Sequence, residues 1–180
     1  MCWFKPHYIY VLLLAFIFLY GCKPEVRNSN GSVKYFEIKR YFTDEAAKLS
    51  QRNTAIVKTV SYNGSAQTKT VAIKNWVREL DLFTSSDINK AAWKDLYTIT
   101  ANADSMVYTA IDTNLHTRRI LISLKANKVT GIRISNFTKN WLYQTKEILA
   151  YYPDSVYYIE KHQAVKLMGV NNYIITGKLK

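Results

Sequence analysis

The stretch 118-RRILISLKANKVTGIRISNFT-138 decides the fold class of this 180-residue chain. Ile120 and Ile122 in its first half, and Ile132 and Ile134 in its second half, recur at every second position. This period of two is typical of strands with one buried face, because successive side chains of a strand point to opposite faces. The polar gap between the halves is too short for a crossover helix, so the two strands must pair antiparallel.

The same pattern extends to both sides of this stretch. Short turns separate seven β-rich runs, which cover 96–102, 106–112, 118–126, 128–138, 140–152, 155–168 and 172–180. Links of this length leave no room for parallel pairing. We therefore expect a long antiparallel meander over the second half of the chain.

Two amphipathic helices are predicted ahead of the meander. Five apolar residues from Tyr35 to Leu49 follow one another at steps of 3, 4, 4 and 3, which predicts a helix over 35–52. Asn75 is a suitable N-cap for a second helix that ends near residue 84, and a short helical turn is expected at 91–93. Apolar stripes of this kind are more often part of a core than a binding surface.

A hairpin is predicted between the two helices. The runs 55–62 and 67–73 are rich in β-formers and flank Asn63-Gly64, the strongest short hairpin signal because both residues accept a positive φ. The resulting fold class is α+β, with two amphipathic helices packed on an antiparallel meander of about nine strands. A strongly twisted sheet of this size is expected to curve into an open, half-barrel-like form.

The first 21 residues have the organisation of an export signal. The apolar run from Ile9 to Tyr20 is shorter than the roughly 20 residues needed to span a bilayer and falls in the range of a secretory h-region. The run ends in Leu19-Tyr20-Gly21-Cys22, which resembles the lipobox of bacterial lipoproteins. This resemblance implies cleavage between Gly21 and Cys22 and lipid attachment to Cys22. An uncleaved signal anchor and an ordinary secreted protein are the alternatives.

The predicted domain organisation follows from this signal. Residues 1–21 form the signal peptide, 22–33 the lipidated cysteine with a flexible tether, and 34–180 a single α+β domain. The expected location is the cell envelope, at the outer membrane, with the lipid anchor as the link to the membrane. Cys2 and Cys22 are the only cysteines, so no thiol would remain for a disulfide or a catalytic nucleophile.

Three further stretches carry a second resemblance. The segments 75-NWVRELDLFTSSDINKAAW-93, 107-VYTAID-112 and 139-KNWLYQT-145 are similar to those of a family of Bacteroidota lipoproteins with no assigned activity. The resemblance implies a fold and a location and supplies no catalytic residues. Exported proteins of that phylum are often O-glycosylated at Asp-Ser or Asp-Thr before an apolar residue, which implies possible sites at Ser105 and Ser155. Asp-Ser is also common turn chemistry.

The chain is strongly basic, with a formal net charge of +12. Behind an export signal this charge does not indicate nucleic acid, and anionic lipid or an acidic envelope protein is the more suitable partner. Because Lys and Arg are scattered along the sequence, a solvated basic surface is the simpler interpretation.

No constellation of residues in the sequence indicates catalysis, a metal or a cofactor. His116 and His162 lie on different elements without ligand spacing, and Glu160 shares a strand face with His162 but lacks a recognisable nucleophile partner. The helix pairs Asp44-Glu45 and Glu79/Asp81 are expected on hydrated outer faces. We therefore do not expect an enzyme.

Aromatic residues gather in the last three strands. They form a possible binding surface for sugar or acyl chains, and the alternative is cross-strand packing. The members of this surface are Trp141, Tyr143, Tyr151, Tyr157, Tyr158 and Tyr173.

Taken together, the sequence predicts a non-catalytic accessory lipoprotein of the envelope. The alternative is a binding module that holds a lipid or another apolar ligand between sheet and helices.

Overall fold

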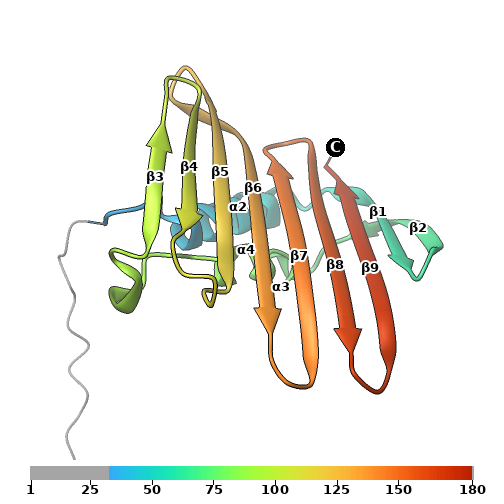
Figure 1. Ribbon diagram of the computed structural model, residues 1–180. Coiled ribbons are helices and arrows are strands. Elements are labelled where there is room, and N and C mark those ends of the chain that lie inside the picture. Colours follow the sequence, from blue (N-terminus) through green and yellow to red (C-terminus); the bar gives the residue numbers. More distant parts are fainter. Residues whose placement is uncertain (1–32, 180) are drawn as a thin grey trace, which may run out of the picture. The chain divides into compact units, whose positions relative to one another are not determined.

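The structure, a computed structural model, describes residues 33–179 (Figure 1). The predicted signal peptide, Gly21, Cys22 and the tether up to residue 32 lie outside the described residues. Among the residues that are described, no helix is long and apolar enough to cross a membrane.

One antiparallel sheet of nine strands forms the domain, in the order β2-β1-β9-β8-β7-β6-β5-β4-β3. The strands from β3 to β9 form the predicted seven-stranded meander, and the predicted hairpin β1–β2 joins it because β1 pairs with β9. The chain therefore brings the early hairpin beside its last strand. The bounds are β1 Ala55–Tyr62, β2 Ser65–Ala72, β3 Tyr97–Ala101, β4 Ser105–Ala110, β5 Thr117–Lys125, β6 Lys128–Lys139, β7 Tyr143–Tyr152, β8 Val156–Val165 and β9 Gly169–Lys178.

The first predicted helix is present as α2, Ile38–Arg52. It begins three residues later than expected because Tyr35 is used elsewhere: its backbone N–H donates to Asn89 Oδ1 at 3.2 Å and its hydroxyl to the Lys94 carbonyl at 2.5 Å. Tyr35 thus joins the segment before α2 to the loop that precedes β3 by hydrogen bonds.

The second predicted helix is divided into α3, Trp76–Glu79, and α4, Asp81–Ser85. Asn75 caps α3 as expected, since its side-chain oxygen accepts from the Arg78 N–H at 2.9 Å. Leu80 leaves helical geometry at φ −98° and ψ 12°, and this break lets both short helices turn apolar side chains toward the sheet. The short 3₁₀ helix η1, Ala91–Trp93, lies at the predicted position.

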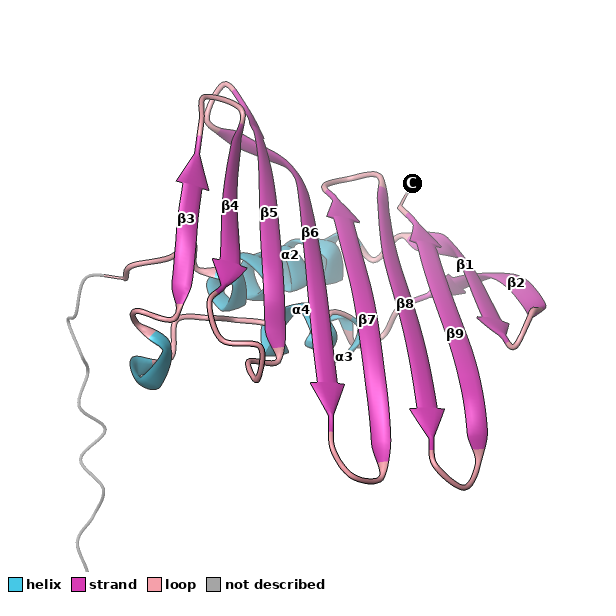
Figure 2. Cartoon of the chain, in the orientation of Figure 1, coloured by secondary structure: helices cyan, strands magenta, loops and turns pink. Residues whose placement is uncertain are grey.

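The helices cover one face of the sheet and leave the other face open (Figure 2). The sheet is not closed: β2 and β3 remain its two edges. The predicted strong curl into a half-barrel is not confirmed. Two helical segments, α2 and the α3–α4 pair, lie side by side on the covered face. Two segments side by side need a broader face than a strongly curved half-barrel would offer.

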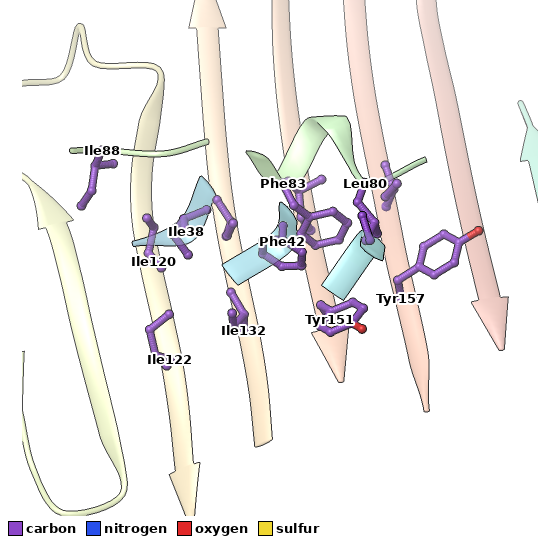
Figure 3. Packing of buried hydrophobic residues seen from close by; sticks show 14 of the residues in the cluster. Ile38, Phe42, Leu80, Phe83, Ile88, Ile120, Ile122, Ile132, Tyr151 and Tyr157 are labelled. Carbon is purple, nitrogen blue, oxygen red and sulfur yellow. The ribbon is translucent and has the colours of Figure 1, made fainter. Parts of the chain in front are cut away.

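The core lies between the helices and the central strands (Figure 3). Phe42 of α2 is fully buried, with its ring centroid 4.6 Å from Phe83 of α4 and 5.2 Å from Tyr151 of β7. From the sheet, Ile120, Ile122, Ile132 and Ile134 all point into this core, as their period of two predicts.

Candidate functional site

The face of the sheet opposite the helices, hereafter the open face, is the candidate site. Residues directly opposite each other on antiparallel strands share a face, so the register defines its rows. One row consists of Thr98, Thr109, Arg119, Ser135, Ile148, Glu160 and Ile174, and the next of Thr100, Val107, Leu121, Arg133, Ala150, Tyr158 and Thr176.

Two arginines dominate the centre of the open face. Arg119 of β5 and Arg133 of β6 are exposed and occupy diagonal positions of the register, beside the half-buried Leu121 and Ile148. Together they line a shallow depression of about 300 Å³. Neither arginine takes part in an ion pair among residues 33–179. A guanidinium offers a planar fork of donors, so this arrangement suits carboxylates next to an apolar side chain.

Glu160, the acidic residue in these two rows, does not neutralise the charge of either arginine through an ion pair. Glu160 accepts a hydrogen bond from the Tyr158 hydroxyl at 3.0 Å, and His162 bonds to Asn172. The structure thus places Glu160 and His162 on one face, as the sequence indicates, but gives each a different partner. This arrangement does not support an acid–base pair.

A buried polar row crosses the covered face, and sequence reasoning missed it. Glu147 of β7 is 5% exposed, and its carboxylate accepts from the Asn136 amide at 3.3 Å and lies 3.2 Å from Lys161 Nζ. The Asn136 amide also donates to Ser86 Oγ at 2.8 Å, while its own oxygen has no partner in the described part of the chain. The sequence did contain a signal for this burial. Glu147 precedes Leu149 and Tyr151 at alternate positions of one strand, so the period of two places all three side chains on the same face.

Two helix carboxylates also lie differently from the prediction. Glu45 and Glu79 do not lie on exposed outer faces, since their side chains are only 13% and 16% exposed. Glu45 accepts from the Tyr151 hydroxyl at 2.5 Å, and Glu79 from the Tyr157 hydroxyl at 2.5 Å. Glu79 also pairs with Lys58 Nζ at 2.5 Å. Burial, together with the neighbouring carboxylates, raises the pKa of both tyrosines. These bonds join the helices to the sheet.

The predicted aromatic surface is divided by the fold. Tyr151 and Tyr157 are fully buried and belong to the core, because they point to the helix-covered face. Tyr158 lies on the open face, and the Tyr173 ring lies against that of Tyr62 at a tilt of 36°, with centroids 4.9 Å apart. Tyr143 is half-buried at the start of β7, while Trp141 projects from the β6–β7 turn. The structure therefore does not bring the six residues together into one surface.

The two predicted glycosylation serines differ in access. Ser155 is exposed in the β7–β8 turn, whereas Ser105 is half-buried and donates to Asn102 Oδ1 at 3.1 Å. Modification of either remains a prediction. Within residues 33–179, no three His, Cys, Asp or Glu side chains are placed to hold a metal ion.

A groove of about 720 Å³ lies at the end of the sheet where β5 begins and β6 ends. His116 lines it, and its Nδ1 shares a hydrogen bond with Thr138 Oγ1 at 2.8 Å. Burial lowers the pKa of His116, and the opposing effect of Glu147 is smaller.

Acidification is expected to destabilise the protein through His116. The unfolded chain binds a proton at the ordinary histidine pKa of about 6.5, whereas the folded imidazole resists protonation. The stabilising contribution is complete above that value and is lost as the pH falls through the lower folded pKa. Urea unfolding at a series of pH values should show a smaller loss for His116→Gln than for the unchanged chain. Equal losses would contradict this.

Comparison with known proteins identifies no relative: the chain matches no family model, no curated protein and no solved structure.

Proposed function

We propose that the chain is a membrane-anchored, non-catalytic accessory protein of the bacterial cell envelope that binds an acidic segment of an envelope protein on its open face. The observation that carries this proposal is the pair Arg119 and Arg133 beside the apolar Leu121 and Ile148 on an uncovered sheet.

The proposed anchor depends on the sequence before the domain. The lipobox-like Leu19-Tyr20-Gly21-Cys22 supports lipid attachment at Cys22 and an outer-membrane location. Each acyl CH₂ that enters the bilayer contributes about 0.8 kcal/mol, so two or three chains hold a protein durably. A domain anchored in this way is concentrated at the membrane surface, where a partner bound with modest affinity is retained.

An acidic partner fits the chemistry of the open face. Arg119 and Arg133 can each form bidentate hydrogen bonds to a carboxylate, and Leu121 and Ile148 offer apolar contact between them. Thr109 of the neighbouring strand β4, which pairs with Arg119, adds a hydroxyl group that can bond to a partner backbone.

The alternative of an apolar ligand between sheet and helices receives less support. Phe42, Phe83 and Tyr151 fill the space between α2, α4 and the central strands, with ring centroids from 4.6 to 6.1 Å apart. A lipid at this position would have to displace a close-packed core.

The proposal is tested by photocrosslinking in the source cells, with a photoreactive amino acid in place of Leu121. We expect an adduct whose crosslinked peptide is rich in Asp and Glu, and an approximately tenfold loss of the adduct when Arg119→Glu and Arg133→Glu are combined, because like charges then oppose each other. The matched control combines Lys125→Glu and Lys128→Glu, which change the charge equally but lie at the exposed β5–β6 turn.

Two outcomes would contradict the proposal. A photoreactive residue at Val77, which is exposed on α3, could give the same adduct, or the adduct could survive reversal of the charge of both arginines.

The anchor is checked on the same material by intact mass, which should show a chain that begins with acylated Cys22. An intact Met1 or an unmodified Cys22 thiol would exclude the anchor.

A further inference from the structure

The most exposed large apolar side chains gather on two adjacent turns at one end of the sheet. Trp141 in the β6–β7 turn is 83% exposed, and Leu167 and Met168 in the β8–β9 turn are 90% and 79% exposed. Leu142 is partly exposed beside Trp141. We name Trp141, Leu142, Leu167 and Met168 the tip patch. Figure 1 shows both turns at the same end of neighbouring strands.

Hydrogen bonds define the backbone of the β6–β7 turn and join it to the β8–β9 turn. Asn140 Oδ1 accepts from the backbone N–H groups of Leu142 and Tyr143 at 2.9 and 2.8 Å, which defines the turn that carries Trp141. The Lys166 N–H donates to the Leu142 carbonyl at 3.0 Å and joins the two turns directly. The exposed side chains of the tip patch are therefore carried on two hydrogen-bonded turns that lie side by side.

One lysine lies beside each turn of the tip patch. Lys139 and Lys166 flank the two turns and are exposed, and the segments 138–143 and 165–169 contain no acidic residue. Neither lysine forms an ion pair among residues 33–179. Apolar tips with lysines immediately behind them match the layers of an anionic bilayer, in which acyl chains lie below negatively charged headgroups.

We propose that the tip patch is a membrane-docking edge, which inserts Trp141, Leu167 and Met168 into the interface of an anionic lipid surface while Lys139 and Lys166 contact the headgroups. Trp suits this depth because one part of its indole is apolar and its N–H is polar. A bilayer is a better partner for two narrow turns than another protein is. A flat protein surface would bury too little area against the turns, whereas a bilayer can deform around them.

This inference builds on the proposed function, because the lipid on Cys22 would keep the domain near a bilayer. It goes beyond that function by assigning an orientation: the sheet stands on the membrane by the ends of β6 to β9, and the open face is directed sideways to its partner. Docking by the tip patch would add a second, reversible contact to the covalent anchor.

The test measures tryptophan fluorescence of the full chain reconstituted in vesicles of phosphatidylcholine and phosphatidylglycerol. Subtracting the emission of the Trp141→Phe variant isolates the signal of Trp141 from those of the other tryptophans. With brominated lipids, whose bromine atoms quench fluorescence only on close approach, we expect about a twofold loss of the Trp141 signal. Vesicles of phosphatidylcholine alone should give a smaller loss because the lysines then lack anionic headgroups.

Leu167→Asp should reduce the quenching of Trp141 by brominated lipid and make Trp141 more accessible to acrylamide. The matched control Val77→Asp introduces the same charge at an exposed apolar residue on α3 and should leave both measurements unchanged. Circular dichroism confirms that each variant is folded. A Trp141 signal that brominated lipid does not affect, or that Leu167→Asp and Val77→Asp change equally, would overturn the docking edge. If the chain nevertheless floats with the vesicles, the anchor stands and only the docking edge fails.

Discussion

Replacing Phe42 with alanine is expected to lower the free energy of unfolding by about 3–5 kcal/mol. Phe42 is fully buried at the centre of the interface between helices and sheet, where its ring meets those of Phe83 and Tyr151. Alanine would remove these contacts and leave a cavity that α2 cannot close, because Glu45 of the same helix is bonded to Tyr151. Urea denaturation of the full chain, followed by far-ultraviolet circular dichroism, measures the change.

The matched control is Thr43→Ala, at the exposed position next to Phe42 on the same helix. Thr43 donates a hydrogen bond only to the Lys39 carbonyl of its own helix, so its replacement should change the stability by no more than about 0.5 kcal/mol. If both variants lost similar stability, the aromatic cluster around Phe42 would not be the centre of the core.

The second large effect is expected at Gly177 of β9. A Cβ atom at this position would lie 2.0 Å from the Tyr157 ring, far inside van der Waals contact. Tyr157 cannot move aside easily, because it is fully buried and its hydroxyl donates to Glu79. Gly177→Ala should therefore cost about 3 kcal/mol, at the upper end of the usual range for overpacking. The same urea titration measures this loss.

Gly131→Ala is the matched control for Gly177→Ala. Its Cβ would lie 3.1 Å from the ring of Tyr152, which is partly exposed and can turn toward solvent, so we expect a cost below about 1 kcal/mol. Removing the obstructing ring should also relieve the clash. In a Tyr157→Ala background, Gly177→Ala should have little further effect, and a full additional loss there would contradict the steric explanation.

The elements that the sequence predicted best are those in which short-range pattern and burial agree. The period of two in β5 and β6, the positive φ at Asn63 and Gly64, and the Asn75 cap all follow from local chemistry, and the structure contains each of them. The turn before β9 was predicted less well: the predicted runs 155–168 and 172–180 leave the turn at 169–171, but β9 begins at Gly169 and the turn precedes it. Strand ends depend on cross-strand hydrogen bonds, which a linear pattern does not contain.

The candidate sites depended more strongly on the fold. Arg119 and Arg133 occupy unremarkable polar positions in their own strands and form a pair only through the register of β5 with β6. Likewise, the tip patch requires two turns that are separated by a whole hairpin to lie side by side. Sequence reasoning selected Trp141 as a member of an aromatic surface but grouped it with Tyr151 and Tyr157, which are buried.

The sequence by itself determined the α+β class, the antiparallel strands and the two amphipathic helical segments, because each depends on residues within a few positions of one another. Only the tertiary structure decided which face the helices cover, that the hairpin joins β9 and that the sheet stays open. It also decided that Glu147 is buried and that Glu45 and Glu79 are largely shielded from solvent by the sheet. These features arise from packing between segments far apart along the chain. Their free energy comes from area and hydrogen bonds shared across the sheet, and these are absent from any local window of sequence.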